Sequence, residues 1–492
     1  MSLSIAPTTE NTTTGQLEAY LAAAQDSFGT WAATSPAQRA GILDVVGDAL
    51  DAAADQLVPV AMAETNLPEP RLRGELKRTT FQLRFFGELL RDGGYLDARI
   101  DHADAQWPMG AARPDLRRTR IPLGPVVVFA ASNFPFAFSV AGGDSASALA
   151  AGNPVIVKAH HGHLELSRLT AQVVNDALAG AGAPDGLFQV VFGTEAGRTV
   201  LLDPQIKAAG FTGSIPGGRA LMDLAVSRDE PIPFYGELGS NNPVFVTEQA
   251  ASVRGEQIVA DFIGSFTTSA GQLCTKPGTL FIPRGSGLRP LLSEAALPAG
   301  AGLLNQRIRE GYGQVLDQLS AHPGVEVLAQ GGEPLGEQPS PTLLITGIDE
   351  LLADPQALQA ECFGPTALVV EYDSEQQLVA AAQTFEGQLT ATIHGEEGDR
   401  VKELVVVLAN KAGRVLWNQW PTGVSVTYAQ QHGGPYPATT AVGTTSVGAA
   451  AIERFVRPVA YQNFPQHLLP AQLQDANPDS VPQLVNGQPR GR

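Results

Sequence analysis

The chain has 492 residues, which predicts two to four domains with a core large enough to fold without disulfide or metal staples. Its formal net charge of −18 argues against nucleic acid and anionic membranes as partners, because both bind basic surfaces. With two cysteines, no leader-like start and no run of about 20 apolar residues, the sequence predicts a reducing cytoplasm and no membrane span.

The first 250 residues change from a helical segment to an alternation of strands and helices. Residues 1–100 have helical spacing of apolar residues, and the polar residues 101–120 predict an extension or linker. From Pro122 onward, short apolar runs predict buried strands. These strands are expected at 126–130, 154–158, 187–192, 206–210 and 243–246, with helices at 141–151 and 164–178.

The second half repeats this alternation, with strands expected at 278–282, 325–329, 342–345, 366–371, 389–394 and 414–418. Unbroken apolar strands between helices indicate parallel sheets covered on both faces, which bind ligands at the carboxyl ends of their strands. The predicted fold class is therefore α/β with two such domains. The polar tail from residue 475 to 492 contains Pro and Gly and is expected to fray.

Several common motifs are absent: G-x-G-x-x-G, G-x-x-x-x-G-K-[ST] and G-x-S-x-G do not occur. The densest histidine cluster is His160, His161 and His163, for which a metal site and a polar loop after a strand are both open. The loop is favoured, because no cysteine or pair of carboxylates stands nearby. No metal is expected.

Two residues stand in settings that would suit catalysis. Cys274 lies in a Gly-rich polar segment with Lys276 two residues on, where a thiolate could be exposed with a lowered pKa, although a lone cysteine is more often a buried hydrophobe. Glu237 lies in an apolar, Gly-flanked segment, where burial would raise its pKa toward general-base work, although structural acids are commoner. Cys362 has no cationic neighbour and is expected to be structural.

Six stretches, taken together, resemble the aldehyde dehydrogenase superfamily over about residues 15–470. They are Asn133-Phe134-Pro135, Lys158, Phe211-Thr212-Gly213-Ser214, Glu237-Leu238-Gly239, Gly271-Gln272-x-Cys274 and Glu361-x-Phe363-Gly364-Pro365. Each stretch is weak alone, but six in the family's order are specific. The resemblance implies that the protein is an enzyme that oxidises an aldehyde to a carboxylate with NAD(P).

For catalysis, the resemblance implies Cys274 as the nucleophile, Glu237 as the general base and Asn133 as a donor to the oxyanion. The reaction would pass through a thiohemiacetal and a thioester on Cys274. Two departures from the family pattern affect the proton path. Ser240 replaces the second glycine of the general-base motif, and Gly142 replaces a lysine that many hydrolytic members carry.

For the cofactor, the resemblance implies a set of residues around the ribose, diphosphate and nicotinamide groups: Lys158, Glu361, Gly213, Ser214 and Phe363. His161 stands where many NAD-preferring members carry Glu, and losing that carboxylate removes repulsion against a 2′-phosphate. NADP is therefore the preferred prediction and NAD the alternative.

The resemblance also implies an aldehyde dehydrogenase-like α/β fold, with two parallel-sheet domains and a small bridging sheet. The dinucleotide-binding domain would use residues 1–103 and 122–238, and the catalytic domain residues 239–440. Segments 104–121 and 441–492 would bridge and oligomerise the protein as a homodimer or homotetramer.

Longer stretches at 131–144, 432–439, 445–448 and 457–465 resemble one branch of the family. It comprises the 2,5-dioxovalerate (α-ketoglutaric semialdehyde) dehydrogenases and the NADP-dependent fatty aldehyde dehydrogenases similar to them. The first group oxidises 2,5-dioxopentanoate to 2-oxoglutarate in sugar-acid catabolism, and this is the favoured prediction. A long-chain aldehyde or another semialdehyde is the alternative.

Substrate contacts differ between these alternatives. Phe136 and Phe138 could line an apolar tunnel or pack in the core, whereas a distal carboxylate needs a cation or hydroxyls, and the candidates are Gln272, Thr275, Lys276 and His432. A catalytically silent scaffold is disfavoured by the intact nucleophile, base and asparagine. A cysteine hydrolase is disfavoured because no histidine lies in a pairing motif.

Overall fold

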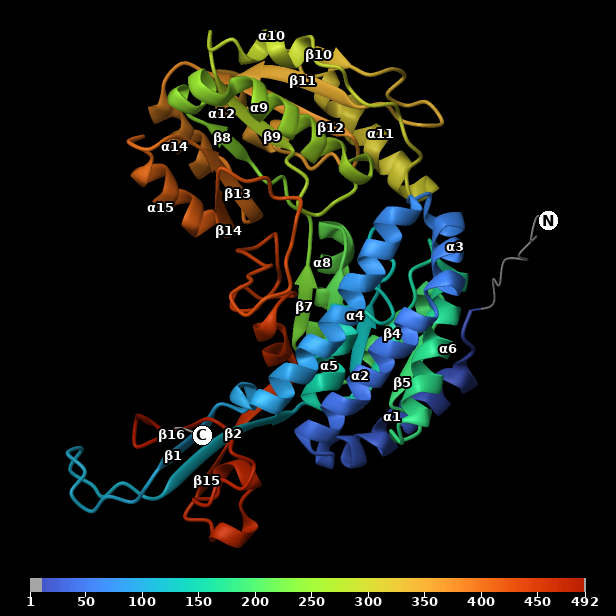
Figure 1. Ribbon diagram of the computed structural model, residues 1–492, viewed down its shortest axis with the longest axis vertical. Helices are drawn as coiled ribbons and strands as arrows, with labels where there is room; N and C mark the ends of the chain where they lie inside the picture. Colours follow the sequence, from blue (N-terminus) through green and yellow to red (C-terminus); the bar gives the residue numbers. More distant parts are fainter. Residues whose placement is uncertain (1–10, 491–492) are drawn as a thin grey trace.

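The computed structural model describes residues 11–490. Residues 1–10 of the predicted dinucleotide-binding domain and residues 491–492 of the predicted tail lie outside the described residues. Figure 1 shows a lower lobe, an upper lobe and a thin arm, each with its own sheet. No helix in the described part of the chain is long and apolar enough to cross a bilayer.

The lower lobe is built on a parallel sheet with the strand order β5-β4-β3-β6-β7. Val126 and Val128 pack against the core under α2, α4, α5 and α6, whereas Val127 and Phe129 pack with α1, α7 and α8. Both faces are therefore buried, which explains the unbroken apolar runs. The strands are β3 (Val126–Phe129), β4 (Val155–Lys158), β5 (Phe188–Val191), β6 (Ala208–Thr212) and β7 (Phe234–Glu237).

The helices of this lobe are α1 (Thr14–Ala33), α2 (Pro36–Ala52), α3 (Ala54–Thr65), α4 (Glu69–Asp92), α5 (Gly143–Ala151), α6 (Leu164–Gly180), α7 (Thr194–Leu202) and α8 (Ile215–Val226). The strands predicted between residues 126 and 210 and the two predicted helices are confirmed. β7 was not predicted, because Pro231, Pro233 and Gly236 interrupt its apolar pattern.

The upper lobe contains a seven-stranded sheet with the order β10-β11-β12-β9-β8-β13-β14. All neighbours are parallel except the edge strand β10, which is antiparallel to β11. The predicted strands of this half are confirmed. They are β8 (Val244–Val246), β9 (Thr279–Pro283), β10 (Glu326–Gln330), β11 (Thr342–Gly347), β12 (Thr366–Tyr372), β13 (Gln388–His394) and β14 (Ala412–Trp417).

The upper lobe's helices are α9 (Glu248–Thr267), α10 (Leu288–Ser293), α11 (Gln306–Ser320), α12 (Ile348–Ala353), α13 (Pro355–Leu358), α14 (Glu375–Thr384) and α15 (Lys402–Lys411). A short 3-10 helix, η2 (Thr268–Gly271), follows α9. The fold class predicted from the sequence, two parallel-sheet units plus a small sheet, is confirmed.

The arm is a mixed sheet with the order β15-β2-β1-β16-β17. Its strands are β1 (Ala98–Asp101), β2 (Leu116–Pro122), β15 (Val456–Gln462), β16 (Gln483–Val485) and β17 (Gln488–Arg490). The expectation that the tail frays is wrong for its described part. β16 pairs with β1, and the Asn486 N–H donates to the Ile100 carbonyl at 2.8 Å.

The chain passes from β7 in the lower lobe directly to β8 in the upper lobe, so the carboxyl ends of the lower strands face the upper lobe (Figure 1). Ligands of parallel sheets bind at this edge. Several residues singled out in the sequence lie at or just after the ends of β3, β4, β6 and β7, and Cys274 lies in the loop after η2.

Candidate active site

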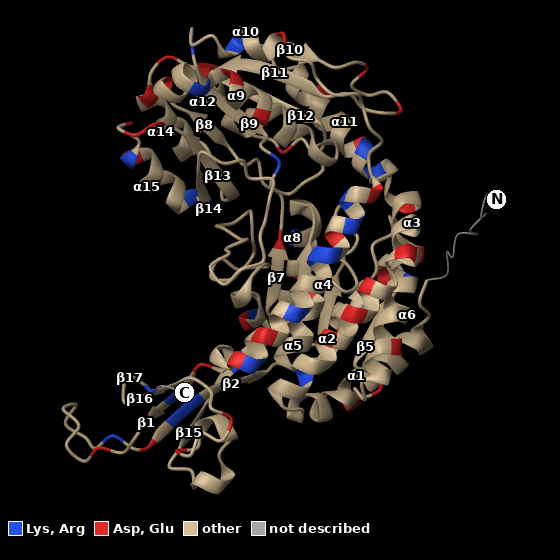
Figure 2. Ribbon diagram, viewed as in Figure 1, with Lys and Arg blue, Asp and Glu red and all other residues tan. Residues whose placement is uncertain are grey.

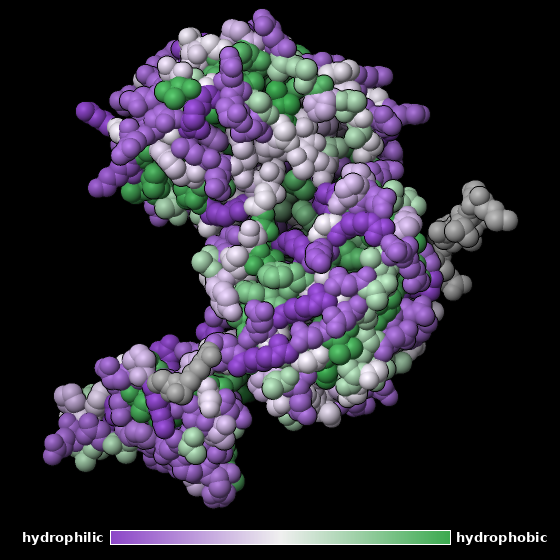
Figure 3. All heavy atoms as spheres, in the orientation of Figure 1, coloured by the Kyte–Doolittle hydropathy of each residue, from purple (hydrophilic) through white to green (hydrophobic). Residues whose placement is uncertain are grey.

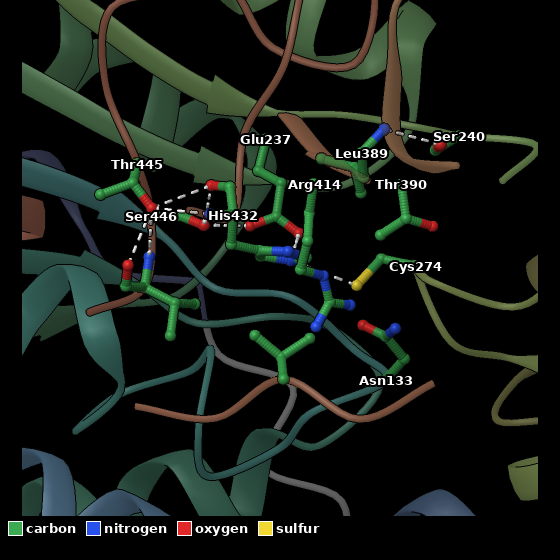
Figure 4. A network of polar contacts seen from close by, with 12 residues as sticks. Asn133, Glu237, Ser240, Cys274, Leu389, Thr390, Arg414, His432, Thr445 and Ser446 are labelled. Carbon is green, nitrogen blue, oxygen red and sulfur yellow. Dashed lines mark hydrogen bonds and ion pairs between the residues drawn. The ribbon is translucent and has the colours of Figure 1, made fainter. Parts of the chain in front are cut away.

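Cys274, His432 and Glu237 contact one another where the two lobes meet (Figure 4). The Cys274 Sγ lies 3.6 Å from the His432 Nε2, which lies 2.8 Å from the Glu237 Oε1. The Ser446 hydroxyl donates to the Glu237 Oε2. The three side chains offer ligand atoms within 4.8 Å of one another, a spacing that also suits a metal ion, so the expectation of no metal stays a prediction.

The proton of His432 can be placed from its surroundings. His432 is 1% exposed, and its Nδ1 is buried without a hydrogen-bond partner. We infer that the His432 Nε2–H donates to Glu237, because a carboxylate oxygen can only accept. This contact also removes the reason that the sequence gave against a cysteine hydrolase, because a histidine does lie beside Cys274.

The loop that carries Cys274 is fixed by glycine and by amide hydrogen bonds. Gly271 has φ +69°, and a Cβ there would lie 2.1 Å from the Gly364 carbonyl oxygen. The Asn242 side chain donates to the carbonyls of Cys274 and Lys276, at 2.8 and 2.9 Å. Ser240, the departure from the family's glycine, contacts the Asn242 side chain at 2.8 Å and thereby supports the same loop.

Asn133 lies in the loop after β3 and reaches the Cys274 loop. Its Nδ2 donates to the Gln272 carbonyl at 3.1 Å. Arg71 of α4 donates to the Asn133 carbonyl at 3.0 Å and pairs with Glu75. Glu75 in turn accepts the N–H of Phe136 at 2.8 Å, so helix α4 holds this loop in place.

The lysine that the family often carries near this loop is excluded by the backbone. A Cβ on Gly142 would lie 2.6 Å from the Ala137 carbonyl oxygen and 2.7 Å from the Ser139 nitrogen. No side chain fits there without moving main-chain atoms. Any proton relay in this protein must therefore use other groups, and His432 and Ser446 are both in contact with Glu237.

Two expectations about charge at the site are wrong. Burial, followed by repulsion from Glu237, raises the pKa of Cys274 well above its usual value, so the resting thiol is neutral. Lys276 cannot lower it, because its Nζ donates to the carbonyls of Cys362 and Thr366 at 2.7 and 2.6 Å, inside the upper lobe. Burial alone would raise the pKa of Glu237, but His432, Ser446 and Cys274 hold that pKa below its usual value.

A cavity of about 260 Å³ opens on Cys274 and His432. Of the residues predicted to contact substrate, Phe138, Thr275 and His432 line it. Phe136 packs instead in the lower-lobe core and is 1% exposed. Gln272 is committed elsewhere, because its Oε1 accepts the Leu304 N–H at 2.9 Å.

The residues predicted to bind the cofactor lie near this site, on the lower strands and across from them. Lys158 ends β4, and Ser214 caps α8 by accepting the Gly217 N–H at 3.3 Å. Gly213 and Ser214 are exposed, as is His161, whose ring lies 4.2 Å from that of His160. Exposed N–H groups at a helix start and a lysine at a strand end suit a dinucleotide phosphate and ribose.

Glu361 and Phe363 belong to the loop before β12 and are both part-buried. A Cβ on Gly239 would lie 2.2 Å from the Glu361 Oε2, so this glycine gives the carboxylate its place beside the general-base segment. The Ser240 N–H donates to Glu361. The Glu361 carboxylate lies between the lobes and can accept further hydrogen bonds, so it is suited to accept one from a ribose hydroxyl.

The histidine cluster is held by the protein itself. The His163 Nε2 contacts the Ala131 carbonyl at 2.9 Å, and its Nδ1 contacts the Ser167 hydroxyl at 3.2 Å. The His160 Nδ1 accepts the Gly162 N–H at 3.0 Å. These contacts are those of a structured loop after β4, the interpretation that the sequence favoured.

Replacing Glu361 with Gln is expected to stabilise the cofactor-free protein above pH 7 and to leave it unchanged near pH 4.5. Burial raises the pKa of Glu361 from 4.5 to about 7, so the folded protein keeps a proton that the unfolded chain releases between these values. Wild-type stability therefore falls as pH rises through this window, by up to about 3 kcal/mol, and the amide does not titrate. Denaturant unfolding of both proteins at pH 5 and pH 8 measures the difference, and equal differences at both pH values would contradict it.

Sequence reasoning missed the groups that surround the predicted residues. Arg71, Glu75 and Arg78 lie at helical spacing on one side of α4, and all three line the cavity. The spacing i, i+4 and i+7 places these three charged residues on one face of α4, and this was a signal that could have been used. Ser446 gave no such signal, because its contact with Glu237 spans 209 residues.

Comparisons with known proteins agree with this geometry. The model of the Aldehyde dehydrogenase family matches residues 4–458. The alpha-ketoglutaric semialdehyde dehydrogenase of Acinetobacter baylyi is 44% identical over 473 residues, which cover 94% of this chain and 90% of that protein. The solved structure of a 3,6-anhydro-L-galactose dehydrogenase in complex with NADP has a TM-score of 0.77 at 21% identity, covering 92% of both chains.

A bifunctional proline utilization A protein has the same TM-score of 0.77 and 21% identity over 92% of this chain, but this chain spans only 45% of that longer protein. The structural matches establish the fold, and the family model and the relative from Acinetobacter baylyi cover nearly the whole sequence. The chain belongs to the aldehyde dehydrogenase family.

Proposed function

We propose that this enzyme oxidises 2,5-dioxopentanoate to 2-oxoglutarate, with NADP as the preferred acceptor. The observation that carries the proposal is the contact of Cys274 with His432 and Glu237 at one cavity, with Asn133 beside them. The substrate is that of the relative that shares 44% of its residues. The unit of residues 1–103 and 122–238 would bind the dinucleotide, and residues 239–440 would supply the nucleophile.

The first step forms a bond between Cys274 and the aldehyde carbon. The thiol is neutral at rest, so its proton must pass to water in the cavity as the sulfur attacks, which leaves the Glu237 carboxylate unprotonated for the later hydrolysis. The aldehyde oxygen becomes an oxyanion, which accepts hydrogen bonds from the Asn133 side chain and the Cys274 N–H. One such donor contributes about 3–4 kcal/mol to the transition state.

The bound nicotinamide supplies the redox chemistry by accepting the hydride. Glu361 and Lys158 would hold ribose hydroxyls and thereby fix the ring against the substrate carbon. The cysteine is left acylated as a thioester. Glu237 then takes a proton from a water that attacks this thioester, and His432 keeps the carboxylate oriented through its 2.8 Å hydrogen bond.

The preference for NADP rests on positive charge near the expected ribose. Burial and the charge of Arg307 both lower the pKa of Lys158, and burial, Lys158 and Arg307 lower that of His161. Lys158 and Arg307 therefore form a cationic region at the end of β4 beside the His161 ring, whose lowered pKa favours its neutral form, and position 161 carries no carboxylate. A 2′-phosphate carries the charge that such a region attracts.

Purified wild-type protein is expected to reduce NADP faster than NAD when 2,5-dioxopentanoate is present, and to prefer this aldehyde over a long alkyl aldehyde. Absorbance of the reduced nicotinamide measures kcat/KM for each of the four combinations. Turnover of the alkyl aldehyde alone would assign the enzyme to the fatty-aldehyde branch. Reduction of NAD alone would keep the reaction and refute the cofactor argument.

A matched variant isolates the cofactor argument. Replacing His161 with Glu places a carboxylate against the expected 2′-phosphate and should lower kcat/KM for NADP about tenfold or more, with kcat/KM for NAD unaffected.

We further infer that the arm joins copies of the chain into a homodimer or homotetramer, because β15 lies at the free edge of its sheet.

A further inference from the structure

Arg78 lies in the wall of the cavity with both ends of its guanidinium unused. Its Nη1 and Nη2 are buried and have no hydrogen-bond partner, and its Nε reaches only the Val424 carbonyl at 3.5 Å. The guanidinium carbon stands 5.4 Å from the centre of the Phe138 ring. Figure 2 shows the basic and acidic residues along α4, and Figure 3 shows that this hydrophilic row runs up to the place where the lobes meet.

The neighbouring carboxylates are hydrogen-bonded to groups other than Arg78. Glu75 pairs with Arg71 through one oxygen and accepts the N–H groups of Phe136 and Ala137 through the other, at 2.8 and 2.9 Å. Glu237 binds His432 and Ser446. A buried guanidinium with two open nitrogens is costly unless a partner arrives.

Arg71 differs from Arg78 although both line the same cavity. Its Nε donates to the Ser269 hydroxyl at 2.9 Å, its Nη2 donates to the Asn133 carbonyl at 3.0 Å, and its Nη1 pairs with Glu75. Each of the three side-chain nitrogens of Arg71 thus has a partner in the protein, and Arg71 supports the Asn133 loop. Of these two cavity arginines, Arg78 is the one with donors left for a ligand.

We propose that Arg78 binds the distal carboxylate of the aldehyde substrate through both terminal nitrogens, and so selects short oxo-acid aldehydes over alkyl aldehydes. The inference rests on the proposed function and adds the residue that gives its specificity. A planar guanidinium accepts a carboxylate bidentately, and Phe138 below it excludes water from the pair. An alkyl aldehyde would leave the buried cation unpaired, which is how a polar site rejects an apolar analogue.

The test compares Arg78→Gln, Arg78→Lys and the control Lys77→Gln, which removes an exposed cation from the next position of α4. Each protein is assayed with 2,5-dioxopentanoate and with pentanal, which has the same length and no carboxylate. Arg78→Gln is expected to raise KM for 2,5-dioxopentanoate about 100-fold and to raise kcat/KM for pentanal, because no buried cation is then left unpaired by the alkyl chain. Arg78→Lys should recover part of the loss, and Lys77→Gln should match the wild type for both substrates.

Binding of 2-oxoglutarate, measured by calorimetry without turnover, provides the second readout. The wild type should bind it, and Arg78→Gln should bind it about 100-fold more weakly. Equal binding by the two proteins, or an equal loss of activity on pentanal and 2,5-dioxopentanoate, would overturn the role of Arg78. If the wild type oxidises neither aldehyde, the proposed function fails, and the 2-oxoglutarate affinities alone decide whether Arg78 binds a carboxylate.

Discussion

Replacing Cys274 with Ala should lower kcat for NADP-linked aldehyde oxidation by about 10⁴-fold or more, because no covalent adduct can then form. Cys274 is the cysteine that lines the cavity and contacts His432. Asn133 and Glu237 would remain in place, but without the sulfur there would be no covalent adduct for them to act on. Initial rates of nicotinamide reduction with saturating substrate measure the loss.

The second cysteine provides the control for this prediction. Cys362 is buried in the upper-lobe core, and its thiol faces the Tyr312 carbonyl at 4.0 Å. Cys362→Ala should keep wild-type kcat and lose only part of the protein's stability, as a small core truncation does. Comparable activity in Cys274→Ala and Cys362→Ala would exclude a cysteine mechanism.

Replacing Glu237 with Gln should slow the steady state about 10²- to 10⁴-fold and expose a burst of about one reduced nicotinamide per active site. The hydride leaves before hydrolysis, so the first turnover can precede the step that needs the carboxylate as a base. Rapid-mixing absorbance measures the burst and the following slow phase.

The matched control is Glu230→Gln, which changes an exposed acid in the segment just before β7 whose carboxylate pairs with Lys207 at 2.9 Å. It should leave both phases as in the wild type. A slow Glu237→Gln variant without a burst would place the role of Glu237 before hydride transfer, at the deprotonation of Cys274.

The two parallel sheets could be predicted because their strands are encoded locally. A strand such as β3 is buried on both faces, so Val126 through Phe129 form an unbroken apolar run that any window of sequence contains. The arm could not be predicted in this way. β15 has only exposed and part-buried residues, and β2, which alternates part-buried with buried residues, pairs with it more than 300 residues away, so no local pattern marks the partner.

The site shows the same division between local and distant information. The short motifs around Asn133, Glu237 and Cys274 were legible as a family pattern, and the fold brings them together. The charge states of Cys274 and Glu237 could not be predicted from the sequence. Lys276 is near Cys274 in sequence but points into the upper lobe, whereas His432 is 158 residues away and contacts the sulfur. Proximity in the sequence therefore wrongly indicated Lys276 as the neighbour of the Cys274 thiol, and His432 was predicted only as a substrate contact.

The most direct test of the central claim is mass spectrometry of the Glu237→Gln variant after mixing with 2,5-dioxopentanoate and NADP. The account predicts one acyl group of the substrate, joined as a thioester to the peptide that contains Cys274. The adduct should require the oxidised cofactor and should be absent from Cys274→Ala. An unmodified Cys274 peptide after a full burst of reduced nicotinamide, or an acyl group on another residue, would contradict covalent oxidation at this cysteine.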